Sequence, residues 1–403
     1  MSNAFPLSPN EVALRSLFKV EPLLSSIGVA EEMLGLEPFV ALHAGPPLKT
    51  DAELPQTIKS SLVLSALYEG WAKDTDDALR LIESGKIHLK PAQEHHCVTP
   101  LAALITQKTS LLGVTDQNSD LPCIFTPLSS GPPPDIRFGA LNLDILNTLE
   151  LRDTTLFRIV RAALKDAIKV RPLALMGLKR GDELHSNTSG ATEALREQLW
   201  DQLYEMNIDE TDRIYLSDLM RKNPGFFLTI WMATCKLYLT SMEGVTGSSI
   251  LTRMGANAQS VGYSTSDSPD KWVIYDAEPP KGNRFEHVSK EVPVEGVIGD
   301  SCVIDIMGFG GQITQHSPEV FETLCPFLPQ DLQNRTNSIM TTTHPHFKEI
   351  PKSNGFFDIQ VGLDLEKMRM HRISPLVNIG MLANDGKAGL LGRGLFSSSQ
   401  AFF

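Results

Sequence analysis

Helical periodicity is concentrated in the middle of this chain. From Asp153, a possible N-cap, the apolar positions follow one face of a helix, and a second apolar stripe follows residue 189. A third helix is predicted to start at Asn223 as cap and Pro224 as first residue, and to run buried to residue 242. The apolar positions of the first two helices are Leu156, Ile159, Val160, Ala163, Leu164, Ala167 and Ile168, then Leu195, Leu199 and Leu203. Residues 149–248 are therefore predicted to form a helical domain.

On both sides of this segment, short apolar runs alternate with Pro and Gly. Helical spacing is expected over 9–24, over 75–87 with Gly85 as the stop, from Val98, and from Ser317 and Pro318 onward. Strands are expected near 39–43, 271–280, 303–307 and 373–382. This mixture predicts an α+β fold in which two α+β domains, residues 1–148 and 249–403, flank the helical domain.

The charge of the chain limits its partners. A net charge of −12 argues against binding nucleic acid or an anionic membrane surface, so an anionic substrate needs a local basic pocket. Residues 1–12 lack a basic segment followed by an apolar core, and the apolar run 226–242 contains Lys236 and is too short to span a membrane. We therefore predict a cytoplasmic protein.

The five cysteines are far apart and show neither a CxxC pair nor the spacing of metal ligands. We therefore expect reduced thiols, no metal and no cofactor. Cys97 follows His95 and His96, but neighbours in sequence do not make a nucleophile and its base. His344 and His346 in the segment HPHF lack an evident third ligand.

The segment IGDSCVIDIMGFGGQ, residues 298–312, places Asp305 inside an apolar run. A buried carboxylate is costly unless N–H groups, a cation or a ligand compensate it. Gly308, Gly310 and Gly311 follow and permit close approach of a ligand, so Asp300, Asp305 and the glycines can form one site. The alternative is a strand with Asp305 on its solvent face and a glycine turn after it. This segment alone leaves both interpretations open.

Other polar clusters lie in predicted loops. GDELHSN, residues 181–187, brings together Asp182, Glu183 and His185, of which Asp182 and His185 have the spacing of a pair on one helical face. The alternative is a polar loop whose acids cap a helix. In EHH, residues 94–96, only one of the two histidines is expected to face a site. LHAGPP and RFGA, residues 42–47 and 137–140, offer backbone amides and Arg137 to an anion.

Taken in order, these segments resemble one family, the proteins similar to the AllG subunit of oxamate carbamoyltransferase. The matching segments are LHAGPP, EHHCVTPLAALI, RFGA, GDELHSN, NPGFFL at 223–228, GDSCVIDIMGFGG at 299–311, VNIGM at 377–381 and GLLGRG at 389–394. The resemblance implies two α+β domains and a helical one, carbamoyl transfer between oxamate and carbamoyl phosphate, and companion subunits.

The chain departs from the pattern of this family at several charged positions. Ser186 and Asn187 stand in place of an Asn-Arg pair, and Ala383 and Asn384 in place of a His-Lys pair. Ala256, Ala258 and Ser260 replace Arg, Gly and Glu. Loss of cationic side chains weakens a site for a doubly charged phosphate, so we expect a changed substrate.

The resulting hypothesis is a homo-oligomeric carbamoyltransferase-like enzyme for a small polar substrate, working in biosynthesis or nitrogen metabolism, with its site between the domains. The alternatives are a non-catalytic subunit or binding protein, and an independent cyclase or hydrolase acting on an amide or urea-like group. The predicted catalytic residues are His185, Asp182, Glu183, His96 and Asp305. The predicted substrate-binding residues are His43, Gly45, Glu94, His95, Arg137, Asn187, Asn223, Asn257, Asp300, Ser301, Gly308, Gly310, Gly311 and Asn378.

Overall fold

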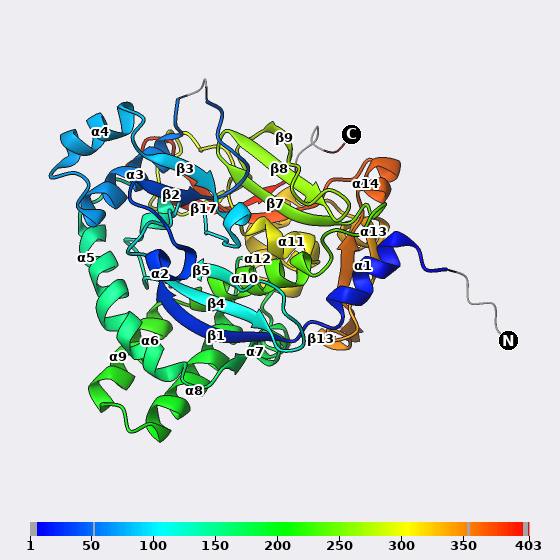
Figure 1. The fold of residues 1–403 in the computed structure, drawn as a ribbon. Coiled ribbons are helices and arrows are strands. Elements are labelled where there is room, and N and C mark those ends of the chain that lie inside the picture. Colours follow the sequence, from blue (N-terminus) through cyan, green and yellow to red (C-terminus); the bar gives the residue numbers. More distant parts are fainter. Residues whose placement is uncertain (1–5, 51–52, 353–354, 398–401, 403) are drawn as a thin grey trace.

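Helices and small, mostly antiparallel sheets alternate along the chain, which confirms the predicted α+β class. The computed structural model describes residues 6–50, 53–352, 355–397 and 402. Helices α8 and α9 form the lower tip of the molecule in Figure 1, and helix α1 lies against the C-terminal segment, where the Asn10 amide donates to Asp364. The predicted absence of a secretory signal concerns residues 1–12, of which residues 1–5 lie outside the described residues.

A four-stranded antiparallel sheet, in the order β5-β4-β1-β6, organises the first part of the chain. A parallel pair, β2 and β3, lies beside it and is linked to it through residues 97–105. The strands of these two sheets are β1 (Pro22–Val29), β2 (Val40–His43), β3 (His88–Pro91), β4 (Ser110–Asp116), β5 (Ile124–Pro127) and β6 (Ile168–Lys169).

The helices of this part agree only in part with the predictions. The helix expected over 9–24 ends at Leu17, since the residues from Pro22 pair as β1. Helix α4 has the predicted start and stops before Gly85, whose φ is 69°. No helix forms from Val98, because the N–H of Val98 pairs with Phe125 of the sheet. The helices are α1 (Pro9–Leu17), α2 (Ala30–Leu34), α3 (Gln56–Glu69), α4 (Thr75–Glu83), η1 (Ala92–His95) and η2 (Ile136–Phe138).

The middle of the chain is helical, as predicted, but two of the expected starts are wrong. Asp153 is not an N-cap: it lies within a continuous helix, in a π-helical turn, where it binds the Arg152 guanidinium and the N–H of Ser110. The last helix begins at Phe226, because residues 223–225 form a turn. The helices are α5 (Asp144–Leu151), η3 (Arg152–Leu156), α6 (Phe157–Ala163), α7 (Val170–Lys179), α8 (Ser189–Glu205), α9 (Glu210–Lys222) and α10 (Phe226–Thr240).

The last part of the chain contains two larger antiparallel sheets, in the orders β11-β7-β8-β9 and β10-β17-β16, and two short hairpin-like pairs, β12-β15 and β13-β14. The strands are β7 (Leu251–Asn257), β8 (Ser260–Thr265), β9 (Val273–Asp276), β10 (Lys281–Arg284), β11 (Ile298–Gly299), β12 (Met340–Thr343), β13 (Ile350–Lys352), β14 (Gly355–Phe357), β15 (Gln360–Leu363), β16 (Val377–Leu382) and β17 (Leu390–Phe396). The helices are α11 (Cys302–Ile306), η4 (Gly310–His316), α12 (Pro318–Leu324), η5 (Cys325–Phe327), α13 (Leu332–Ile339) and α14 (Leu365–His371).

The strand predicted over 303–307 is wrong, because these residues form the short helix α11. Every residue of α11 is buried, so the run carries neither the period of a strand nor that of an amphipathic helix. Gly299 and Gly308, with φ of 134° and 96°, bracket it and allow the chain to turn tightly on either side. Asp305 is therefore not on the solvent face of a strand.

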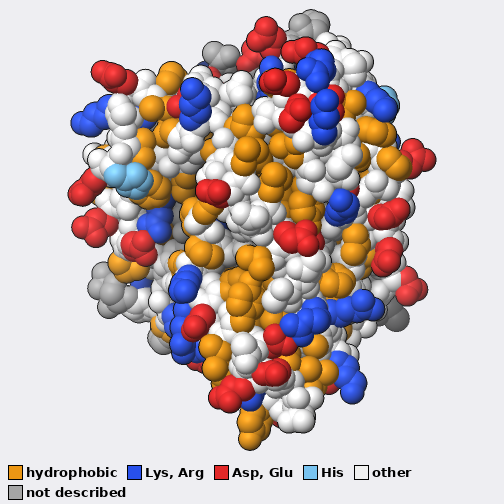
Figure 2. Space-filling model, turned by 90° about the vertical axis from the view of Figure 1, so that its left-hand side faces the viewer, with side chains coloured by type: hydrophobic (Ala, Val, Ile, Leu, Met, Phe, Trp, Pro, Cys, Tyr) orange, Lys and Arg blue, Asp and Glu red, His pale blue; other side chains and the backbone are white. Residues whose placement is uncertain are grey.

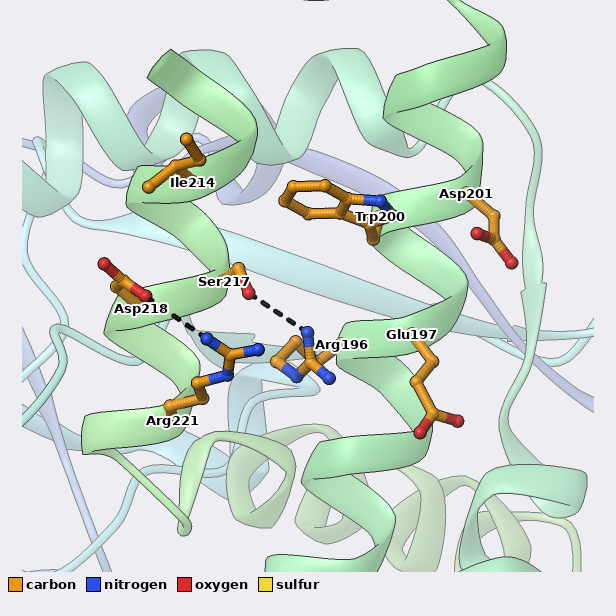
Figure 3. A pocket seen from close by; sticks show the side chains of 8 residues that line it. All are labelled: Arg196, Glu197, Trp200, Asp201, Ile214, Ser217, Asp218 and Arg221. Atoms are coloured by element: carbon orange, nitrogen blue, oxygen red, sulfur yellow. Dashed lines mark hydrogen bonds and ion pairs between the residues drawn. The ribbon is translucent and has the colours of Figure 1, made fainter. Parts of the chain in front are cut away.

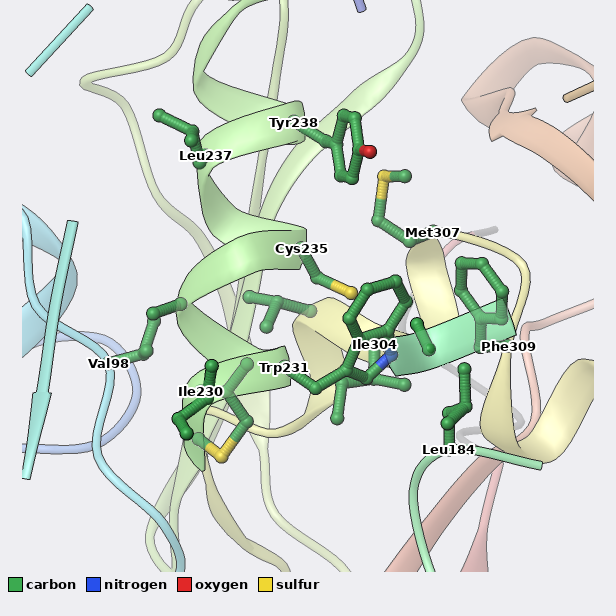
Figure 4. Packing of buried hydrophobic residues seen from close by; sticks show 14 of the residues in the cluster. Val98, Leu184, Ile230, Trp231, Cys235, Leu237, Tyr238, Ile304, Met307 and Phe309 are labelled. Carbon is green, nitrogen blue, oxygen red and sulfur yellow. The ribbon is translucent and has the colours of Figure 1, made fainter. Parts of the chain in front are cut away.

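Helix α10 lies at the centre of the main hydrophobic core. Trp231 and Tyr238 are fully buried, and Figure 4 shows Trp231 and Cys235 facing Ile304 and Phe309 of the α11 region. The same helix packs against strands β4 and β5 of the first sheet. Its predicted burial is confirmed, and among the described residues no helix is both long and apolar enough to cross a membrane. The division into residues 1–148, 149–248 and 249–403 stays a prediction.

The buried carboxylate of Asp300 binds three groups of the first part of the chain, one after β2, one in η1 and one shortly after η1. It accepts hydrogen bonds from the N–H of Gly45 (2.9 Å), the N–H of Thr99 (3.1 Å) and the side-chain amide of Gln93 (2.7 Å). Burial raises the pKa of Asp300 to about 7, while these three hydrogen bonds act in the opposite direction. Asp300 was predicted to bind substrate, but both of its carboxylate oxygens accept hydrogen bonds from other parts of the chain.

We expect Asp300→Asn to destabilise the protein by about 1–3 kcal/mol, because an Asn side chain places an NH₂ group opposite one of the three donors. Chemical denaturation of the two proteins measures this difference. Asp385→Asn, at an exposed turn, is the control. Equal stability of Asp300→Asn and the parent would contradict this structural role.

Candidate functional site

A pocket of about 370 Å³ opens where the helical segment meets the C-terminal sheets. Its walls come from the loop 185–189, the turn between α9 and α10, the η2 region, Ser301 at the start of α11, and strands β16 and β17. Of the predicted site residues, His185, Arg137, Asn187, Asn223 and Ser301 line it. Residues far apart in sequence therefore converge on one cavity.

The loop before helix α8 is shaped by the buried carboxylate of Glu183. Its oxygens accept hydrogen bonds from the N–H groups of His185, Ser186 and Asn187. Leu184 takes a φ of 68°, which is unusual for a side chain of this kind and bends the loop around the carboxylate. Glu183 therefore positions His185 and does not itself reach the pocket lining.

His185 and Asp305 form the central polar pair of the site. The Nδ1 atom of His185 lies 2.8 Å from Oδ2 of Asp305, and both side chains are almost completely buried. The other oxygen of Asp305 accepts hydrogen bonds from the N–H of Gly311 (2.7 Å) and the N–H of Asn378 (3.1 Å). Asp305 thus fixes the imidazole ring from behind, while His185 lines the pocket.

Gly310 permits this close arrangement. A Cβ atom at residue 310 would lie 2.4 Å from Oδ1 of Asp305 and 2.9 Å from Cβ of His185. Its φ is 54°, and its N–H donates to the carbonyl oxygen of Glu183. The predicted glycines 308, 310 and 311 therefore act by packing and by the Gly311 N–H, and none of them lines the pocket.

The electrostatic surroundings of His185 favour its protonated form. Burial acts to lower the pKa of His185, but the negative charges of Asp305 and Glu183 outweigh it and raise the pKa above its usual value of 6.5. Burial also raises the pKa of Asp305, against the stabilising charge of His185. The two neighbouring carboxylates thus stabilise the protonated imidazole.

Asp182 is not the partner of His185, contrary to the prediction. Its two oxygens accept hydrogen bonds from the N–H groups of Gly190 (3.0 Å) and Ala191 (2.8 Å) in the first turn of α8. This is the alternative that the sequence left open, in which an acid of the loop caps a helix. The three-residue spacing is uninformative here because the loop is not helical.

Several other predicted residues also have roles in the fold. The Asn257 amide donates to the carbonyl oxygen of Pro46, and its oxygen accepts from the N–H of Ser260. Asn378 contributes its backbone N–H to Asp305. Glu94 accepts a hydrogen bond from Trp272 near the surface. His43, Gly45, Glu94, His95, His96, Asn257, Asp300 and Asn378 do not line the pocket.

The pocket also contains residues that sequence reasoning missed. Lys222 ends α9, Arg393 forms a 2.7 Å ion pair with Glu319, and Phe138, Leu228 and Phe285 supply apolar surface. Of these, Phe138, Leu228 and Arg393 fall in segments already quoted for the family resemblance, RFGA, NPGFFL and GLLGRG, which was the available signal. Phe285 and Glu319 carried no motif.

The departures from the family pattern are distributed unevenly around the site. Ser186 and Asn187 line the pocket. Ala256, Ala258 and Ser260 belong to the β7–β8 hairpin region, and Ala383 pairs with Val294, so none of these four is among the lining residues. Of the positions at which the sequence analysis expects a departure, 186 and 187 are therefore the ones in the pocket wall.

A second groove lies between α8 and α9, on the surface of the helical tip (Figure 3). Its charged groups are largely paired within the groove: Arg221 lies 3.6 Å from Asp218, and Arg196 donates to Ser217. Within the described part of the chain, no three His, Cys, Asp or Glu side chains gather as a metal site. The pocket around His185 is the better candidate because it combines a buried titratable pair with apolar walls.

We expect Asp305→Asn to lower the pKa of His185, because the substitution removes the largest charge that raises it. NMR titration of ¹³C-labelled histidine, with the signal assigned from His185→Asn, measures the change. His371, exposed in α14, serves as the unchanged internal reference. An unchanged or higher pKa of His185 in the variant would refute the pairing.

Comparisons with known proteins agree with this architecture. In a crystal structure, a conserved protein of unknown function from Enterococcus faecalis V583 has the same fold, with a TM-score of 0.88 at 23% identity, covering 96% of this chain and 93% of that one. The oxamate carbamoyltransferase subunit AllG of Escherichia coli K12 is 26% identical, over 90% of this chain and 87% of its own length. The uncharacterised protein YahG of the same organism is 24% identical, over 98% of this chain and 84% of its own length.

A family model also matches this chain. The model described as "Oxamate carbamoyltransferase subunit AllG" matches residues 87–301, more than half of the chain. The matched range includes Arg137, the loop 181–187 and Asp300. This chain belongs to the AllG family of oxamate carbamoyltransferase subunits.

Proposed function

We propose that this chain is an enzyme subunit that transfers a carbamoyl or related amide group, with His185 as the group that moves the proton. The observation that carries the proposal is the 2.8 Å contact between the buried side chains of His185 and Asp305 at the wall of the pocket. Membership in a family named after a carbamoyltransferase subunit supports the reaction class.

The chemistry follows from the two nitrogens of the imidazole. With the Nδ1 proton directed to Asp305, the neutral ring presents Nε2 as a base to an attacking N–H or O–H group. Attack on a carbamoyl carbon forms the new bond as this proton moves to Nε2. The bond between that carbon and the leaving group then breaks, and the leaving group takes the proton from Nε2. Asp305 orients the ring and stabilises the imidazolium while it exists.

A further group near the pair is suited to the carbonyl oxygen of a substrate. The hydroxyl of Ser301 lines the pocket and makes no hydrogen bond with the described part of the chain. The side-chain NH₂ groups of Asn187 and Asn223 each donate one of their two hydrogens, to Ser317 and Ser129. Because its hydroxyl is not engaged, we assign Ser301 to hold the carbonyl oxygen as negative charge develops on it.

A second candidate function is a binding subunit that has lost the reaction. The observation in its favour is the presence of Ser186 and Asn187, in place of a family Asn-Arg pair, in the pocket wall. Since the relative AllG is named as a subunit, we also propose companion subunits for this chain. A homo-oligomeric state and a cytoplasmic location stay predictions.

We expect His185→Asn to reduce carbamoyl transfer by about 100- to 10,000-fold, the usual contribution of a positioned acid or base. The assay follows carbamoyl transfer to candidate amide acceptors, with the chain alone and with subunits encoded beside it. The melting temperature should fall as well, because Asp305 loses the ring that compensates its buried charge, so activities are compared at a temperature at which both proteins are folded. His371→Asn is the control and should keep full activity. Undiminished transfer by His185→Asn would instead refute the assigned role, and absence of transfer by the parent with its subunits would favour the binding function.

A further inference from the structure

The backbone amides beside the pocket are already bound to carboxylates of the protein. Glu183 occupies the N–H groups of residues 185–187, and Asp182 occupies those of Gly190 and Ala191. The N–H of Ser189 donates to the side-chain oxygen of Asn187. Free amides in a tight turn and at a helix start are the groups that usually bind phosphate. Here they are satisfied internally, and two negative charges stand where a phosphate would otherwise bind.

The side-chain charges around the cavity leave little excess of positive charge. Arg393 is neutralised by Glu319 at 2.7 Å, and Asp135 lies 3.6 Å from Nε of Arg137. Lys222 forms no ion pair with the described residues and is exposed at the end of α9. The carboxylate of Asp305 offsets the positive charge of a protonated His185. This balance suits a ligand with one negative charge better than one with two.

Arg137 is the best-placed group to receive that charge. Its backbone N–H donates to Asp135, and its guanidinium lies 4.9 Å from the centre of the Phe138 ring at the pocket wall. Its Nε lies 3.6 Å from Asp135, and its terminal Nη atoms make no hydrogen bond with the described part of the chain. Two parallel N–H groups on a planar guanidinium match the two oxygens of a carboxylate.

The rest of the lining is largely apolar. Leu101, Phe138, Leu228, Phe285 and Ile379 come from five separate segments and face the same cavity. Such walls desolvate a hydrocarbon group favourably but make a strongly hydrated dianion costly to bury. The pocket is thus built for a ligand with an apolar body and one anionic end.

We propose that the pocket takes a monocarboxylate with an apolar body, whose carboxylate is bound by Arg137 with Lys222 nearby, and not a phosphate dianion. One part of this proposal rests on the proposed function, namely that the reacting amide or urea-like group of the substrate lies beside His185. The carboxylate subsite itself depends on Arg137 and the apolar walls. The two ideas can therefore fail separately.

The test is isothermal titration calorimetry of the full chain with 3-phenylpropionate, its neutral amide 3-phenylpropanamide, and inorganic phosphate. We expect the carboxylate to bind about 10- to 100-fold more tightly than the amide, the range for a hydrogen bond to a charged group. Phosphate should neither bind measurably nor displace the carboxylate. Equal binding of carboxylate and amide, tighter binding of phosphate, or no binding of the carboxylate at millimolar concentration would each overturn the proposal.

Variants of Arg137 test whether this residue binds the carboxylate. Arg137→Gln should lose the preference for carboxylate over amide, whereas Arg161→Gln, exposed on α6, should keep it. Arg137→Lys keeps the charge but loses the paired donors, so it should bind more weakly than the parent, and it replaces the Gln variant if that one does not fold. Unchanged binding in whichever Arg137 variant folds would overturn the proposal. The preference for carboxylate over amide reports on Arg137, whereas the loss of turnover in His185→Asn reports on the proposed function, so the two tests are independent.

Discussion

The buried carboxylate of Asp305 is the interaction on which the arrangement of the site depends. A carboxylate without solvent contact is costly unless hydrogen bonds and charge compensate it. Asp305 gains this compensation from the N–H groups of Gly311 and Asn378 and from the ring of His185. These groups come from η4, β16 and the loop before α8, so one side chain holds together the segments that form the pocket.

Two further buried carboxylates extend this principle. Glu183 organises the loop that carries His185, and Asp300 fastens the loops that contain Gly45, Gln93 and Thr99. In each case, backbone N–H groups converge on a buried carboxylate, as they converge on a bound anion in other proteins. On the outer face shown in Figure 2, acidic and basic side chains are interspersed among apolar ones.

Hydrophobic periodicity predicted the fold class and the buried helix α10, because it is a local signal. The sequence failed where tertiary contacts override local pattern. Residues 302–306 form a helix that is buried on all sides and so shows no amphipathic period, and Asp182 binds the first turn of α8 instead of His185. The pairing of His185 with Asp305, 120 positions away, depends on chain topology that no local spacing encodes. Lys222 and Phe285 carry no motif and become recognisable only as neighbours in the cavity.

The central claim is that Asp305 acts in the reaction through His185. A double-mutant cycle with Asp305→Asn, His185→Asn and the combined variant, read out as turnover, tests it most directly. The account predicts strong non-additivity: Asp305→Asn lowers the turnover of the parent but has little further effect once His185 is replaced. Fully additive losses would contradict it, because they would mean that the two residues contribute independently.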